Sequence, residues 1–137
     1  MIPYKQFNVN PKGKKTDDCS IRALATAIEI PYHQVMQEMF DISMKTGYAF
    51  GSMNVIERIL KYHGFVKHKQ PRKSDGTKYL VGEIDRLCFT HELEMGVVIS
   101  LAHHLTATTV DIDTDLACLQ DTWDCRYKTI GNFWTRS

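Results

Sequence analysis

The sequence predicts an α+β fold in which N-terminal helices pack on a C-terminal, mostly antiparallel sheet. Segments with apolar residues at helical spacing come first, over residues 19–64, and segments typical of strands follow from residue 65 onward. Helices that precede strands, rather than alternating with them, are typical of the α+β class. No change in composition marks a domain boundary, so we expect a single domain over residues 1–137.

The first helix is expected over residues 19–30, after an extended lead-in over residues 1–16 that Pro3, Pro11 and Gly13 interrupt. Asp17 or Asp18 is the expected N-cap, with its side chain turned to backbone N–H groups. The apolar face of this helix consists of Ile21, Leu24, Ala25 and Ile28.

Two further helices are expected before residue 65. Pro31 suits the first turn of a helix over about residues 31–45. Ser52 can cap a third helix that Gly64 ends, because glycine commonly terminates helices. The expected buried stripe of the second helix is Val35, Met36, Met39 and Phe40.

The second half of the chain contains the expected strands. Residues 65–69 alternate as a short strand does, residues 69–78 form a polar loop, and residues 80–88 suggest a short helix. The remaining strand candidates are residues 95–101, 104–111, 117–123 and 128–134.

The composition is that of an ordinary globular protein and argues against several classes. Hydrophobic residues make up 43% and charged residues 24% of the chain, and the net charge is +1. Nucleic acid is therefore not an expected partner, and the basic runs at residues 12–15 and 67–78 are interpreted as solvated loops. No stretch approaches the ~18 apolar residues of a membrane span, and the N-terminus lacks the apolar core of a secretory signal. We expect a cytoplasmic protein without a membrane partner.

Four cysteines, Cys19, Cys88, Cys118 and Cys125, are expected to be reduced thiols in that compartment. Their spacing contains no CxxC pair. A zinc site from Cys118, Cys125 and His103 or His104 can be imagined, but the pattern is weak, so neither a metal nor another cofactor is predicted.

One cysteine stands out by its position. Cys19 begins the first predicted helix, His103 and His104 begin a predicted strand, and Asp121 and Asp124 follow the next strand in the segment DTWD. A helix N-terminus and a nearby imidazolium both lower the pKa of a thiol, and a carboxylate can fix the orientation of the imidazole. Asp17 and Asp18 oppose this effect, because negative charge beside a thiol raises its pKa.

The three segments DDCSIRALA, HHLTATTVD and DTWD, in this order, resemble the papain-like cysteine peptidase superfamily, in the style of its small bacterial and phage members such as the C39-like peptidases. The resemblance spans about residues 8–134. It implies a papain-like fold whose helical half carries the cysteine and whose sheet half carries the histidine and its partner. For a phage-encoded member, the compartment would be the host cytoplasm.

Carried over to this sequence, the resemblance implies that Cys19 is the nucleophile, His104 the general base and Asp121 the orienting carboxylate of a catalytic triad. His103 and Asp124 are the alternates. His104 is preferred because it directly precedes the apolar strand, and Asp121 because Trp123 is expected to cover the pair while Asp124 lies further along the turn.

The chain departs from the superfamily at one position. A glutamine usually precedes the cysteine by about six residues and donates to the oxyanion, whereas this chain has Gly13 there. The candidate replacements are the side-chain amides of Gln6, Asn8 and Asn10, together with the backbone N–H of Cys19. Losing one such donor typically costs ~10²–10³ in rate.

Three functional hypotheses remain open on the sequence. The first is a cysteine hydrolase or acyltransferase (peptidase, deamidase or transamidase) that acts on a peptide or amide bond through a thioester. The second is an inactive papain-like module that binds another protein, such as a host protein. The third is a zinc-dependent module, which would contain stoichiometric zinc. Independently of these, Cys19 can be interpreted as a buried small hydrophobic residue without a chemical role.

Overall fold

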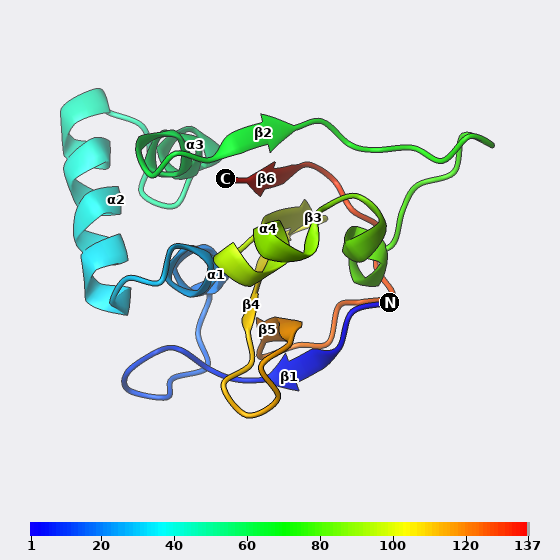
Figure 1. Ribbon diagram of the computed structural model, residues 1–137. Helices are drawn as coiled ribbons and strands as arrows, with labels where there is room; N and C mark the ends of the chain where they lie inside the picture. Colours follow the sequence, from blue (N-terminus) through cyan, green and yellow to red (C-terminus); the bar gives the residue numbers. More distant parts are fainter. Residues whose placement is uncertain (137) are drawn as a thin grey trace.

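The computed structural model describes residues 1–136 and has an α+β fold, as expected (Figure 1). In these residues, helices cover both faces of one six-stranded sheet with the strand order β1-β5-β4-β3-β6-β2. The helices are α1 (Cys19–Ile28), α2 (Tyr32–Thr46), α3 (Met53–Tyr62), the 3₁₀ helix η1 (Val81–Arg86) and α4 (Thr90–Met95). The strands are β1 (Tyr4–Gln6), β2 (Val66–His68), β3 (Val98–Leu101), β4 (His104–Val110), β5 (Ala117–Asp121) and β6 (Phe133–Thr135).

The sheet is mixed rather than purely antiparallel. Strand β1 runs parallel to β5, with Gln6 opposite Asp121, and the remaining pairs are antiparallel. The expectation for residues 1–16 was an extended lead-in, and three of these residues in fact join the sheet edge. Nothing in the short segment YKQ distinguishes an edge strand from an extended loop, because its hydrogen bonds depend on β5 being in place.

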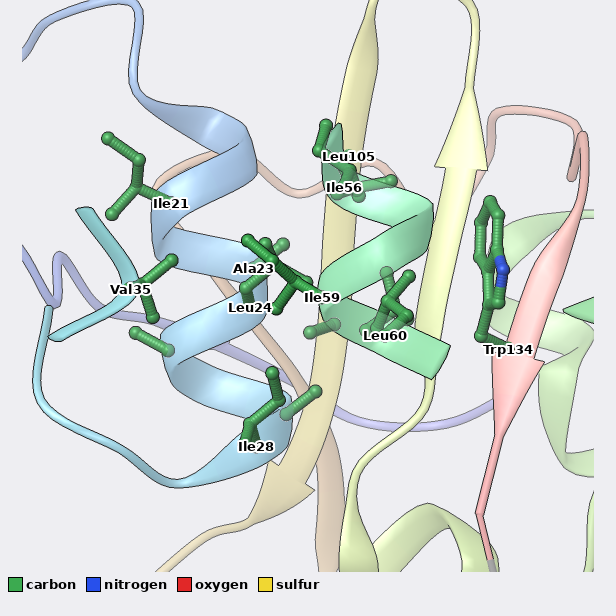
Figure 2. Close-up of a cluster of buried hydrophobic side chains, with 14 of the residues drawn as sticks. Ile21, Ala23, Leu24, Ile28, Val35, Ile56, Ile59, Leu60, Leu105 and Trp134 are labelled. Atoms are coloured by element: carbon green, nitrogen blue, oxygen red, sulfur yellow. The ribbon is translucent and has the colours of Figure 1, made fainter. Parts of the chain in front are cut away.

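The main hydrophobic core lies between the sheet and helices α1 and α3 (Figure 2). Ile21, Leu24 and Ile28 on α1 recur at helical spacing and face Leu105 of β4, while Ile59 and Leu60 contribute from α3. In Figure 1, α2 lies on the outer side of α1, away from the sheet. Helix α1 is therefore held between the sheet and α2, which fixes the position of its N-terminus.

A second core covers the opposite face of the sheet. It contains residues from η1, α4 and the strands, including Ile84, Leu93, Val97, Leu119 and Phe133. The side-chain hydroxyl of Thr108 accepts from the backbone N–H of Val97 and donates to the carbonyl of Leu93, which satisfies buried polar groups on this side. Most of β4 and β5 is thus buried between the two cores.

Several expectations about the helices need correction. Met36 and Phe40 were expected in the buried stripe of the second helix, but they are 38% and 53% exposed, because only one narrow face of α2 contacts α1 and α3. Helix α4 was not expected, since its six residues are too few to display a helical period. The loop over residues 69–78 is confirmed and projects away from the body of the protein (Figure 1).

Among the described residues, no helix has the length and apolar character needed to cross a bilayer.

Candidate active site

The sheet topology brings three chemically important residues to one place. Cys19 is the first residue of α1, His104 the first residue of β4, and Asp121 the last residue of β5. Strands β4 and β5 are adjacent and antiparallel, with Thr108 opposite Leu119, so the start of one lies beside the end of the other. Because α1 packs along β4, its N-terminus reaches the same edge.

His104 is held on one side by a buried carboxylate. Its Nε2 atom lies 2.6 Å from Oδ2 of Asp121, and both side chains are largely buried. This bond uses Nε2 and leaves Nδ1 as the ring nitrogen that faces other neighbours. The preference for His104 and Asp121 over the alternates agrees with this geometry.

Cys19 and His104 both line the same cleft, and their pKa values move in opposite directions. The interaction with His104 lowers the pKa of the half-buried Cys19 thiol more than burial raises it, and the backbone of Leu105 adds to the lowering. Desolvation lowers the pKa of His104, but the hydrogen bond with Asp121 and the interaction with Cys19 outweigh burial and raise that pKa to about 9. Both shifts favour a thiolate beside an imidazolium.

The other three cysteines behave in the opposite way. Burial raises the pKa of Cys88 and of Cys125 to about 12, and burial also raises the pKa of Cys118. At neutral pH these residues are thiols with low reactivity. The electrostatics therefore single out Cys19.

Arg22 connects the helix that carries Cys19 to the strand that carries Asp121. Its Nε donates to Oδ1 of Asp18 at 2.8 Å, and its Nη1 donates to Oδ1 of Asp121 at 2.9 Å and to the hydroxyl of Thr122 at 3.2 Å. All three charged side chains are nearly buried. Arg22 was not recognised from the sequence, although the i, i+4 spacing of Asp18 and Arg22 is typical of an ion pair on one helix face.

Asp18 does not cap α1 in the expected way. It occupies the N-cap position, but its side chain makes no cap hydrogen bond. Instead, its carboxylate accepts from Arg22, from the hydroxyl of Tyr32 at 2.7 Å and from the side-chain amide of Asn10 at 3.0 Å. Burial raises the pKa of Asp18, but the hydrogen bonds from Tyr32, Arg22 and Asn10 outweigh it, so the pKa is lowered and the carboxylate is ionised.

The arrangement around Asp18 has two consequences for Cys19. The guanidinium of Arg22 offsets the negative charge beside the sulfur, and it contributes to lowering the pKa of Cys19. The carboxylate of Asp18 accepts from side chains rather than from backbone N–H groups of the first turn of α1. The backbone N–H groups of Cys19 and Ser20 are therefore left without a side-chain cap.

Trp123 packs against the exposed side of the histidine. Its ring meets the His104 ring edge-on at a centroid distance of 5.1 Å, and 42% of the residue remains exposed. Trp123 was expected to cover the His104–Asp121 pair, and its ring contacts the His104 side of that pair.

Cys19 and His104 open into a cleft of about 580 Å³, called the Cys19 cleft below. Helix α1 forms one side of the cleft, and Phe50, Met53 and Glu57 line a second side. The turn between β3 and β4, with Leu101 and His103, lines a third. The sulfur is thus accessible to a ligand of peptide size.

The alternate residues take other positions. His103 lies exposed in the turn between β3 and β4 with a positive φ of 57°, and it lines the cleft without a hydrogen-bond partner among the described residues. Asp124 accepts two hydrogen bonds from the guanidinium of Arg126, both at 2.9 Å.

The structure does not bring the three candidate oxyanion amides to the Cys19 cleft. The side-chain amide of Asn8 donates to the carbonyl of Lys14, and that of Asn10 donates to Asp18 and Tyr32. Gln6 lines a different hollow beside Thr16 and Thr122. The segment before α1 does not fold over the sulfur of Cys19. Strand β1 pairs with β5, and this pairing places Gln6 at the separate hollow that Arg22 also lines.

Within residues 1–136, the one cluster with metal-ligand spacing is His104, Asp121 and Cys125, whose ligand atoms lie within 4.8 Å of one another. It differs from the imagined zinc site, since Cys118 and His103 are not part of it. Both oxygens of Asp121 already accept hydrogen bonds, from His104 on one side and from Arg22 and the N–H of Thr122 on the other. The adjacent guanidinium disfavours a cation at this cluster.

Comparison with known protein families, curated proteins and solved structures gives no match for this chain.

Proposed function

We propose that this protein is a papain-like cysteine hydrolase or acyltransferase that acts on a peptide or amide bond through a thioester. The observation that carries the proposal is that His104, which bonds Asp121 at 2.6 Å, lines the same cleft as Cys19 and lowers the pKa of its thiol. A base placed between a nucleophile and an orienting carboxylate is the arrangement that nucleophilic catalysis requires.

The first half of the reaction uses the thiolate–imidazolium pair. The Cys19 thiolate attacks the carbonyl carbon, and the carbonyl electron pair moves onto oxygen. The backbone N–H groups of Cys19 and Ser20 at the α1 N-terminus are the donors for this oxyanion. His104 then gives its proton to the leaving nitrogen, the C–N bond breaks, and a thioester remains on Cys19.

The second half resolves the thioester. Neutral His104 takes a proton from water, and the hydroxide attacks the thioester carbonyl, which releases a carboxylic acid and restores the thiolate and imidazolium. An amine in place of water gives transamidation by the same steps. Asp121 stays ionised throughout, because the hydrogen bond from His104 outweighs burial and lowers its pKa.

The proposal is tested by the rate at which iodoacetamide alkylates each cysteine at pH 7, with mass spectrometry to assign the sites. Cys19 is expected to react at least ~10-fold faster than Cys88, which is also half-buried but has a raised pKa. His104→Ala should slow Cys19 and leave Cys88 unchanged. Equal and slow alkylation of both cysteines in the unaltered protein would contradict the proposal.

A second candidate is a binding module that has kept the fold and lost catalysis. It is favoured by the absence of Gln6, Asn8 and Asn10 from the cleft, since the oxyanion then has backbone donors alone. The two candidates differ in turnover. The protein is incubated with a mixture of fluorogenic peptide amides. Only if the thioester forms should hydrolysed product accumulate and mass spectrometry detect an acyl adduct on Cys19.

A further inference from the structure

The side of the Cys19 cleft formed by the α2–α3 connection and the start of α3 carries two large apolar side chains that are open to solvent. Phe50 and Met53 line the cleft and are 46% and 41% exposed. Neither residue belongs to either hydrophobic core, so packing within the fold does not account for them. Large apolar side chains left exposed beside a reactive sulfur are a surface that a ligand's own apolar group would cover.

The charges around the same cleft are acidic. Asp17 and Glu57 both line it. Glu57 is compensated by Lys67, whose Nζ lies 2.9 Å from Oε1, whereas Asp17 has no hydrogen-bond or ion-pair partner within residues 1–136. Lys14 and Lys15 are close to Asp17 in sequence, but they line the separate hollow next to Gln6. Because the Cys19–His104 pair is neutral overall, the cleft keeps the negative charge of Asp17.

We infer that the substrate is a peptide segment with one large aliphatic side chain, which packs on Phe50 and Met53, and one basic side chain, which approaches Asp17. This inference rests on the proposed function and names the substrate class of the same site. Phe50 and Met53 determine the apolar preference, and Asp17 determines the charge preference. A small polar amide would leave the apolar side of the cleft uncovered, which is why a peptide fits the cleft better.

Acetylated dipeptide chloromethyl ketones test the inference, since they alkylate Cys19 through one warhead and differ only in their side chains. A probe with leucine is expected to react about 10-fold faster than the same probe with alanine, at the low end of what a hydrophobic pocket discriminates because this cleft is open. A probe with lysine beside the leucine is expected to react about two- to fivefold faster than one with glutamate, and less so at high salt.

Substitutions assign each preference to its residue. In Phe50→Ala and in Met53→Ala, the ratio of the alkylation rate with the leucine probe to that with the alanine probe should fall toward one. In Asp17→Asn, the ratio of the rate with the lysine probe to that with the glutamate probe should fall toward one. Each ratio is measured within one variant, so it is independent of changes in sulfur reactivity. Phe89→Ala, which removes an exposed aromatic ring outside the cleft, should keep the ratios of the unaltered protein.

The outcomes separate this inference from the proposed function. If iodoacetamide alkylates Cys19 rapidly but the leucine and alanine probes react equally fast, the apolar preference is wrong while the nucleophile stands. If the ratios persist in Phe50→Ala and in Met53→Ala, the subsite lies elsewhere. If Cys19 reacts slowly with iodoacetamide and with every dipeptide, the proposed function fails, and the inference fails with it.

Discussion

At the scale of single residues, the two aspartates before Cys19 differ in burial and in role. Asp18 is buried and ionised within hydrogen bonds from Arg22, Tyr32 and Asn10, so its charge is compensated locally. Asp17 is exposed and lines the cleft. An acidic pair beside a thiol therefore does not prevent thiolate formation here, because His104 and the guanidinium of Arg22 both lower the pKa of Cys19.

The pH dependence of Cys19 reactivity follows from the same pair. Alkylation requires the thiolate, so its rate should rise with pH through a midpoint below the ordinary thiol range, because His104 lowers the pKa of Cys19. Turnover also needs a protonated His104 for the leaving nitrogen, so it should fall as pH rises through about 9. Turnover is expected to be bell-shaped with pH, whereas alkylation is not.

Asp121→Asn tests this explanation. The substitution removes the negative charge that helps to raise the pKa of His104, so the imidazolium should be lost at lower pH and the alkylation midpoint of Cys19 should move upward. Rates of iodoacetamide reaction from pH 5 to 10 give the alkylation midpoint of Cys19 in the unaltered protein and in the variant. Asp124→Asn is the matched control, since Asp124 pairs with Arg126 rather than with His104. An unchanged midpoint in Asp121→Asn would contradict the assigned role of Asp121.

At the scale of elements, the placement of Cys19 depends on how closely α1 approaches the sheet. Gly96, between α4 and β3, lies against the backbone of Ala27 in the last turn of α1, and a side chain there would collide with the Ala27 carbonyl. Its φ of 109° is also a conformation that favours glycine. The guanidinium of Arg136 donates to the carbonyls of Ala27 and Met95 at the same contact.

Gly96→Ala should therefore destabilise the protein by about 2 kcal/mol or more, since it adds a backbone collision to the strain of a positive φ. Gly76→Ala is the matched control, because Gly76 has a φ of 87° but no atom near its missing side chain. That variant should lose only about 1 kcal/mol. Urea unfolding followed by circular dichroism measures both. Equal losses would show that the contact with Ala27 is not tight.

At the scale of the whole molecule, the site exists only where the helical part meets the sheet. Cys19 belongs to α1, while His104 and Asp121 belong to β4 and β5. Arg22 spans this junction, since it bonds Asp18 before α1 and Asp121 at the end of β5. Apolar packing brings the helix onto the sheet, and Arg22 fixes where its first turn lies relative to the carboxylate.

Arg22→Met should accordingly affect both stability and chemistry. Removing the guanidinium takes the arginine partner from two buried carboxylates, and breaking a buried ion pair typically costs about 3–5 kcal/mol. It should also raise the pKa of Cys19, so the alkylation midpoint moves to higher pH. Arg22→Lys keeps the charge but not the two-pronged geometry, so the alkylation midpoint should recover more than the stability does. A midpoint that stays unchanged in Arg22→Met would limit Arg22 to a structural role.

The order of elements was predictable because it depends on local patterns. The apolar spacing of residues 19–30 predicts a helix, and α1 covers Cys19–Ile28. The strand expected over residues 104–111 corresponds to β4. Helix α4 was missed because its six residues are too few to show a helical period. Strand β1 and the exposure of Phe40 were missed because each depends on which distant segments pack beside it. The same limit explains why Arg22 and the true partners of Asn10 were not recognised.

The sequence by itself determined which residue types begin and end each element, and therefore that a thiol, an imidazole and a carboxylate lie at element ends. Only the tertiary structure decided that these ends meet, that Asp18 turns to Arg22 instead of capping α1, and that Gln6, Asn8 and Asn10 point elsewhere. The physical reason is the distance along the chain over which each interaction acts. Hydrophobic periodicity acts over a few residues and is written in the chain, whereas hydrogen bonds between buried charged groups depend on which surfaces the folded chain brings together.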